Sequence, residues 1–480
     1  MRGQAQARTL LGKLALRRGD LETAVRELGA ALFLGNAQEE RIALQAPARL
    51  GPDAESIAHG RAASVMGEWL GLEAVALYAT ALARSGAGEE ALRVVLEAHA
   101  RDLRGDLDPM QALRALAGLE GPRWRISSED TRAWVANAEL GLVTWVVGAD
   151  TTLALYATQE PDGALRVLHA SVPRGRESLT EAARRLREAV AVARAQWFAR
   201  EARAAWSELF PGELQQALAE RIEQVGSPAK EARLLIVAHG PLEGLPLELM
   251  PVNAAGNPLE SQCVPLILPG ISRARPQEAP EPGLWLRWVL LGAPRDAAGK
   301  QRLEGAESEL RQVAKERPQA ELFLGAKFQR SALEGALQSG QCLHIATHLL
   351  PGCRAQEEGF DDASLELDGG QVLCVREVAE LNPASPLVVL STCESGGGTF
   401  VDGQGLQGLA RALLHGGTRN VVATLWPVSD RAAAHFSVAF HTELALGALP
   451  SVATHRARVA LERLGIALVD RAAFRCLGQD

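Results

Sequence analysis

Hydrophobic residues recur at three- and four-residue spacing through roughly the first 100 positions, which are rich in Ala, Leu, Glu and Arg. This spacing is typical of amphipathic helices, because strands alternate every second residue. Small residues and glycines recur at matching offsets along the same stretch, which lets helices pair closely and turn between pairs. The matching positions are Leu11, Gly12, Gly19, Ala24, Leu28 and Ala31, then Ala79, Gly86, Ala91, Val95 and Ala98.

The two sets lie about two 34-residue periods apart, the period of tetratricopeptide repeats. We expect two such units around a degraded middle unit at 39–71, interrupted by Pro47 and Pro52. A plain helical bundle is the alternative interpretation. So short a stack needs a neighbour to cover its open end, so these helices are expected to pack on the next domain of the chain.

The pattern changes after Gly121-Pro122. Residues 140–158 are rich in Val, Thr and aromatics around Gly148-Ala149-Asp150, which predicts a β-hairpin. A long helix over 178–204 and a second over 211–225 come next. The apolar run 234–237 is typical of a buried parallel strand.

From Leu286 onward, short apolar runs alternate with helical patterns. This alternation predicts a mostly parallel α/β sheet with helices on both faces. Strands are expected at 286–292, 322–324, 342–347, 387–392 and 420–425, and helices at 302–316, 329–339, 405–415, 430–446 and 451–464.

The chain of 480 residues is too long for one ordinary core. Gly121-Pro122 and a Pro-rich linker at 274–283 divide it. We therefore expect a helical region at 1–120 and two further domains, at 121–280 and 281–480.

Composition excludes several classes of function. The net charge is −8 and basic residues are spread along the chain, which argues against nucleic-acid binding. Apolar runs are too short to span a membrane, and the N-terminus lacks a secretory signal, so a cytoplasmic protein is expected. The six cysteines form no C-x-x-C pair, so neither a metal site nor a disulfide framework is expected.

Two of the expected strands end in reactive side chains. The strand at 342–347 leads into His348, and the strand at 387–392 leads into Cys393. If these strands are parallel neighbours, the two side chains emerge at one edge of the sheet. An imidazole stabilises the nucleophilic thiolate and then protonates the departing amine. Glycines 396–398 allow a substrate to approach closely, and the N–H of Cys393 is a candidate oxyanion donor.

These motifs identify a resemblance to CHAT-domain proteins, caspase-like peptidases that are often fused to tetratricopeptide repeats and are related to separase. The resemblance covers about residues 125–480. It implies a caspase-like fold in which an inactive amino-terminal half packs on an active half, with His348 as base and Cys393 as nucleophile. The matching stretches are 234–248, 343–348, 387–396, 405–414, 416–417 and 421–430.

One position departs from the family pattern. The usual Gly after the catalytic His is Leu349 here. Its backbone N–H remains a candidate second oxyanion donor beside that of Cys393, but a Leu side chain disfavours positive φ.

Two acidic residues are candidates for substrate binding. Asp430 either caps the helix expected at 430–446, or contributes the carboxylate of a pocket for a basic P1 side chain, as the resemblance to separases implies. Asp402, after the glycines, is a second pocket candidate. His344 lies four residues before His348 on one strand face and is either a supporting partner or a structural histidine.

The expected function is a bacterial cysteine endopeptidase that needs no cofactor or metal and cleaves a protein partner after a basic residue. The resemblance implies a role in signalling, cell death or antiphage defence. The resemblance also implies gasdermin-like pore formers and CRISPR effectors as the kinds of partner. The N-terminal helices are expected to bind the substrate or an activator. The alternatives are an inactive scaffold protein and a hydrolase of small acyl compounds.

Overall fold

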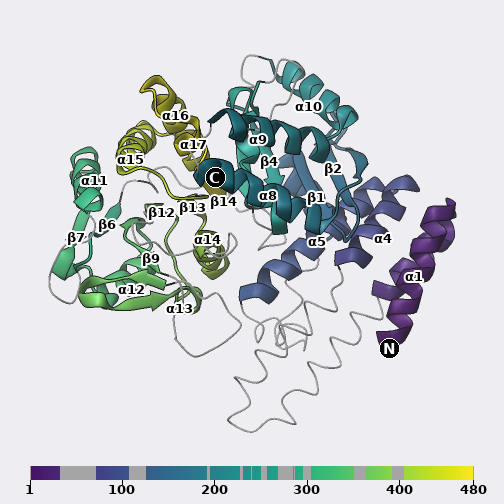
Figure 1. The fold of residues 1–480 in the computed structure, drawn as a ribbon, viewed down its shortest axis with the longest axis horizontal. Coiled ribbons are helices and arrows are strands. Elements are labelled where there is room, and N and C mark those ends of the chain that lie inside the picture. The colour runs from purple at the N-terminus through teal and green to yellow at the C-terminus, as the bar shows by residue number, and fades with distance from the viewer. Residues whose placement is uncertain are drawn as a thin grey trace, which may run out of the picture.

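The computed structural model describes most of the chain, and its central feature is an 11-stranded mixed sheet (Figure 1). The strand order is β3-β2-β1-β4-β5-β14-β13-β12-β8-β6-β7. The described residues are 2–32, 72–107, 126–191, 195–226, 231–238, 240–249, 257–268, 285, 287–295, 304–350, 364–391 and 405–478.

Each strand of the sheet is short and apolar. The runs predicted from the sequence form β4, β6, β7, β8, β12 and β13, and the predicted hairpin forms β1 and β2. The strands are β1 (Leu142–Val147), β2 (Thr152–Gln159), β3 (Leu165–Val172), β4 (Arg233–Val237), β5 (Val264–Leu268), β6 (Trp288–Gly292), β7 (Glu321–Leu324), β8 (Cys342–Ala346), β12 (Leu387–Ser391), β13 (Asn420–Thr424) and β14 (Phe474–Gly478).

Apart from β2 and β3, which form an antiparallel edge on β1, the sheet consists of two sets of parallel strands that run in opposite directions. β1, β4, β5 and β14 are parallel to one another, and β13, β12, β8, β6 and β7 form the other parallel set. β14 pairs in parallel with β5 and antiparallel with β13, so the last strand of the chain joins the two sets. The carboxyl ends of the two sets therefore lie at opposite edges of the sheet.

Helices cover both faces of this sheet, because the strands are apolar on both sides. In Figure 1, α1 lies at one end of the molecule and α11 at the other. The helices are α1 (Arg2–Arg18), α4 (Leu72–Arg84), α5 (Gly88–Leu107), α7 (Ser128–Ala136), α8 (Arg176–Ala191), α9 (Ala195–Leu209), α10 (Gly212–Val225), α11 (Glu304–Glu316), α12 (Arg330–Gln338), α13 (Val375–Glu380), α14 (Gly405–Gly416), α15 (Asp430–Ala445), α16 (Pro450–Arg463) and α17 (Leu468–Arg471).

The core has one layer on each side of the sheet. One face packs against α8, α9, α10, α12 and α14 along both strand sets. The other face packs against α4, α5 and α7 over β1, β4 and β5, and against α11, α15 and α16 over β6, β8, β12 and β13.

The N-terminal helices form hairpins, as the small-residue pattern predicts: α4 and α5 pack on the sheet, and α1 packs on α4. Gly19 and Gly86 have positive φ at the turns, and a Cβ added at Gly12 would overlap the side chain of Leu28. The predicted middle unit at 39–71 lies outside the described residues.

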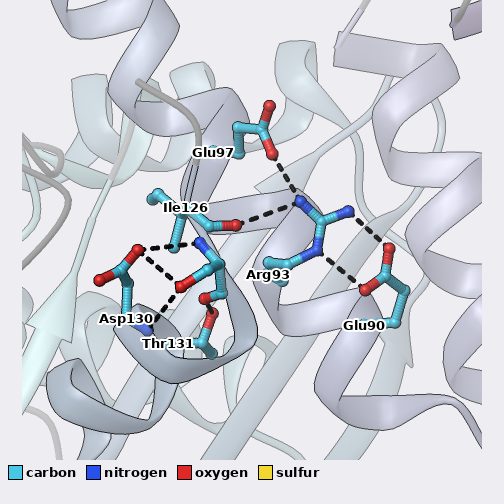
Figure 2. A network of polar contacts seen from close by, with 7 residues as sticks. Glu90, Arg93, Glu97, Ile126, Asp130 and Thr131 are labelled. Atoms are coloured by element: carbon cyan, nitrogen blue, oxygen red, sulfur yellow. Dashed lines mark hydrogen bonds and ion pairs between the residues drawn. The ribbon is translucent and has the colours of Figure 1, made fainter. Parts of the chain in front are cut away.

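A polar network holds α5 against the start of α7 (Figure 2). The Arg93 guanidinium donates to Glu90 and Glu97 on its own helix, and to the carbonyl of Ile126 at 3.3 Å. Ser127 and Asp130 form a capping box that begins α7 directly after that carbonyl. The helical region is thus attached to the sheet by hydrogen bonds as well as by apolar packing.

Three features differ from, or add to, the sequence prediction. The single helix expected at 178–204 is two helices, α8 and α9, which pack against each other. Cys374 is disulfide-bonded, whereas no disulfide framework was expected. A second, three-stranded sheet in the order β11-β10-β9 was not predicted. Its strands are β9 (Leu349–Leu350), β10 (Ser364–Glu366) and β11 (Val372–Cys374).

Candidate active site

The strand that leads to the predicted base lies beside the strand that leads to the predicted nucleophile. β8 and β12 pair in parallel, with Ala346 opposite Ser391 at their carboxyl ends. The N–H of Thr347 donates to the carbonyl of Ser391 at 3.2 Å, so the pairing extends to the residue before His348. Cys393 itself lies outside the described residues, as does Asp402.

His348 is buried at the junction between the large sheet and the small one. Its carbonyl accepts the N–H of Glu366 on β10 at 3.0 Å. The hydroxyl of Thr347 donates to the carbonyl of Glu366 at 2.6 Å. The small sheet therefore holds this part of the chain at two points, the hydroxyl of Thr347 and the carbonyl of His348.

A carboxylate faces the imidazole of His348. Oε2 of the buried Glu366 lies 4.0 Å from His348 Nε2. Because Glu366 lies opposite His348 across β9 and β10, both side chains project from the same face of the small sheet. We missed Glu366 in the sequence, because only the register of β10 against the chain after β8 brings it to the histidine.

Leu349 is an extended residue of an edge strand. It pairs with Leu365, and the hydrogen bond from Glu366 to His348 flanks this pair. In such a pair the N–H groups point away from the partner strand. The N–H of Leu349 therefore faces the outer edge of β9. Leu349 has no positive φ, which among the described non-glycine residues is found at Ala293 and Asn382.

Asp430 is the first residue of α15 and lies at the same edge of the sheet as His348, because β13 is parallel to β12 and β8. Ser429 is the residue that caps the helix, since its side chain accepts the N–H of Ala432. The exposed Asp430 carboxylate lies against Gly305 in the first turn of α11. Helix capping thus does not require the Asp430 side chain.

His344 is fully buried and hydrogen-bonded on both ring nitrogens. Nε2 lies 3.0 Å from Glu309 Oε1 and Nδ1 lies 3.0 Å from His441 Nε2. If His344 supports the site, it does so through Glu309 on α11 and His441 on α15. The sequence did not single out either residue.

The other cysteines of the described part are unlike a nucleophile. Cys263, Cys342 and Cys476 are buried thiols, and burial raises the pKa of Cys342 to about 12. A thiol in such surroundings stays protonated. Within the described ranges, no group of three or more His, Cys, Asp or Glu side chains has a geometry that could hold a metal ion. No helix in those ranges is long and apolar enough to cross a membrane.

A family model described as "CHAT domain" matches residues 199–467. Two crystal structures of the Saccharomyces cerevisiae separase–securin complex share the fold, with TM-scores of 0.53 and 0.55 and sequence identities of 11% and 12%. The alignments cover 97% and 95% of this chain but only 38% and 37% of the matched chains. No curated protein matches the sequence. The similarity to separase thus shows a caspase-like fold, and this chain spans less than two fifths of those larger proteins.

Proposed function

Because the chain belongs to the CHAT domain family, we propose that it is a cysteine endopeptidase in which His348 and Cys393 form the catalytic dyad. The observation that carries the proposal is the pairing of β8 and β12 up to Thr347 and Ser391. This pairing brings the chain segments that lead to both residues to one edge of the sheet, where α/β enzymes place their reactive groups.

The chemistry follows from these positions. The Cys393 thiolate attacks the scissile carbonyl, and the new C–S bond turns the carbonyl oxygen into an oxyanion held by the N–H groups of Cys393 and Leu349. Protonated His348 donates its proton to the leaving amine as the C–N bond breaks, which leaves a thioester. His348 then takes a proton from water, the hydroxide hydrolyses the thioester, and the thiol regains its proton.

The carboxylate of Asp430 supports a preference for Arg or Lys at P1. It is exposed at the carboxyl edge, and the helix cap is made by its neighbour Ser429. A carboxylate at this place forms charge-assisted hydrogen bonds with a basic side chain. Asp402 is the second proposed pocket residue.

The substrate and setting follow from the resemblance. We propose a protein substrate in a bacterial cytoplasm, in signalling, cell death or defence, with a gasdermin-like protein or another effector as the substrate and the N-terminal helices as the surface for an activator. The separase structures contain securin, a protein partner of that enzyme. The second candidate function is an inactive scaffold protein, because Leu349 replaces the family's Gly. For either function we propose domains at 1–120, 121–280 and 281–480.

The test is cleavage of fluorogenic peptides varied at P1 by the purified full chain. We expect cleavage after Arg and Lys that is lost in Cys393→Ala, and loss of the basic preference in Asp430→Asn. Glu213→Gln is the matched control, because Glu213 is also an acidic residue in a first helical turn, on α10. Absence of cleavage, with no labelling of Cys393 by an acyloxymethyl ketone, would support the scaffold.

A further inference from the structure

A continuous chain of polar side chains, buried except for the half-buried Ser391, lies beneath the carboxyl ends of β8 and β12, on the face covered by α11 and α15. It joins four elements that are far apart in sequence, and its hydrogen bonds are 2.6 to 3.4 Å long. Its members are Glu309 on α11, Arg317 directly after α11, His344 on β8, Ser391 on β12, and Ser437 and His441 on α15.

One set of proton positions satisfies every bond in this chain. Arg317 Nε can only donate, so Nδ1 of His441, at 3.4 Å, is an acceptor. A neutral His441 then carries its proton on Nε2 and donates it to Nδ1 of His344. His344 in turn donates from Nε2 to Glu309. Both imidazoles are neutral in this arrangement, in agreement with the pKa of His441, which burial, with the Arg317 guanidinium nearby, holds well below its ordinary value.

Glu309 ends the chain as a buried carboxylate. Burial raises its pKa, but hydrogen bonds from His344, Ser437 and Ser391 outweigh this, and the pKa lies below the ordinary value. The hydroxyl of Ser437 donates to Oε1 at 2.6 Å, and the hydroxyl of Ser391 donates to Oε2 at 2.8 Å. A charged acceptor makes each of these bonds stronger than a bond between neutral groups.

Ser391 is thus fixed at two points. Its carbonyl accepts the N–H of Thr347 and its hydroxyl donates to Glu309. Thr347 directly precedes His348, and Ser391 is two residues before Cys393. One carboxylate therefore holds the end of the nucleophile strand, and through His344 it also holds the strand of the base.

We propose that Glu309 is a positioning residue that sets the relative placement of the His348 and Cys393 strands through Ser391 and His344. This inference rests on the proposed function. A positioning role means that the network affects the reactivity of the Cys393 thiol and kcat. A network that only stabilises the core would affect the free energy of unfolding and neither of these rates.

The two serines provide a matched test. Ser391 and Ser437 donate to the same carboxylate, but only Ser391 lies on the strand that leads to Cys393. We measure the iodoacetamide alkylation rate of Cys393 by mass spectrometry, kcat and KM on the best P1 peptide, and the melting temperature, in Ser391→Ala and Ser437→Ala.

We expect Ser391→Ala to lower the alkylation rate and kcat about tenfold with KM unchanged, because small misplacements of a reacting group are costly. Ser437→Ala is expected to lower the melting temperature to a similar extent and to leave both rates within about twofold. Equal effects of the two substitutions on the rates, or none from Ser391→Ala, would overturn the inference.

Alkylation keeps this inference separable from the proposed function. A wild-type chain that cleaves no peptide, yet has a fast-reacting Cys393 slowed by Ser391→Ala, would contradict the proposed cleavage of these peptides and support the positioning role. A wild-type Cys393 no more reactive than the buried Cys342 would overturn both.

Discussion

At the scale of single residues, the environment of His348 combines a fixed backbone with a facing carboxylate. Glu366 reaches within 4.0 Å of Nε2 from a strand that also holds the His348 carbonyl. A carboxylate in this place can orient the imidazole during proton transfer to the leaving group. Glu366 thus adds a third group to the proposed dyad.

We expect Glu366→Gln to lower kcat about tenfold with little change in KM, because the substitution keeps the shape and removes the charge. Steady-state kinetics on the best peptide substrate measure this, with Glu334→Gln as control, since Glu334 bonds only Arg330 on the surface of α12. An unchanged kcat in Glu366→Gln would show that the carboxylate has no part in catalysis.

A second residue, His455 on α16, predicts a pH dependence of stability. Burial, with Arg458 and Arg456 nearby, lowers its pKa to about 4. The unfolded chain binds a proton near the ordinary pKa of about 6.5, whereas the folded chain does not. The free energy of unfolding therefore falls as the pH drops from about 6.5 to about 4. His455→Gln should flatten this part of the curve in denaturant titrations at several pH values, and an unchanged slope would contradict it.

At the scale of elements, the first turns of α11 and α15 meet at the proposed pocket. A Cβ at Gly305 would overlap the carboxylate of Asp430, so these helix starts approach closely only because residue 305 is a glycine. The same two helices carry Glu309 and His441. The proposed pocket and the buried network therefore both include residues of α11 and α15.

We expect Gly305→Ala to displace Asp430 and to weaken cleavage after Arg and Lys, seen as a higher KM for these peptides. Gly335→Ala on α12 is the control, because nothing lies within 4 Å of a Cβ added there. Alanine in that helix should stabilise the fold by about 1 kcal/mol without a change in KM. Equal KM values in the two variants would contradict the placement of Asp430 in the pocket.

The elements themselves were largely predictable. β8 is apolar apart from His344 and β12 apart from Ser391, and burial on both faces requires such runs in a parallel sheet, so local composition located them. β14 was missed because Arg475 interrupts its short apolar run. Only the pairing of β14 between β5 and β13 creates a buried environment in which that charge is neutralised.

At the scale of the whole molecule, a buried ion cluster ties β14, the strand between the two sets, to the segment that follows β4. Arg475 on β14 makes two hydrogen bonds of 2.7 Å to Glu248, and donates to the carbonyls of Glu243 and Leu245. Burial raises the pKa of Glu248, but Arg475 outweighs it and the pKa lies below its ordinary value. The cluster therefore makes the placement of β14 against the segment after β4 depend on one arginine.

We expect Arg475→Met to destabilise the whole protein by about 3–5 kcal/mol, because it leaves a buried carboxylate without its partner. Adding Glu248→Leu to this variant should recover part of the loss, as a double-mutant cycle measures. Urea denaturation followed by tryptophan fluorescence gives these values. Loss from Arg475→Met of less than about 1 kcal/mol would show that the cluster does not hold β14 in place.

The sequence by itself determined the local features of this protein: the apolar strands, the amphipathic helices, and the reactive residues that come directly after two of the strands. These depend on periodicity and short spacing, which burial imposes on neighbouring residues. The tertiary structure decided what surrounds them. Glu309, Glu366, His441 and Arg475 gain their roles from strand register and helix packing between distant segments, because a buried charge is stable only where the fold supplies its partners.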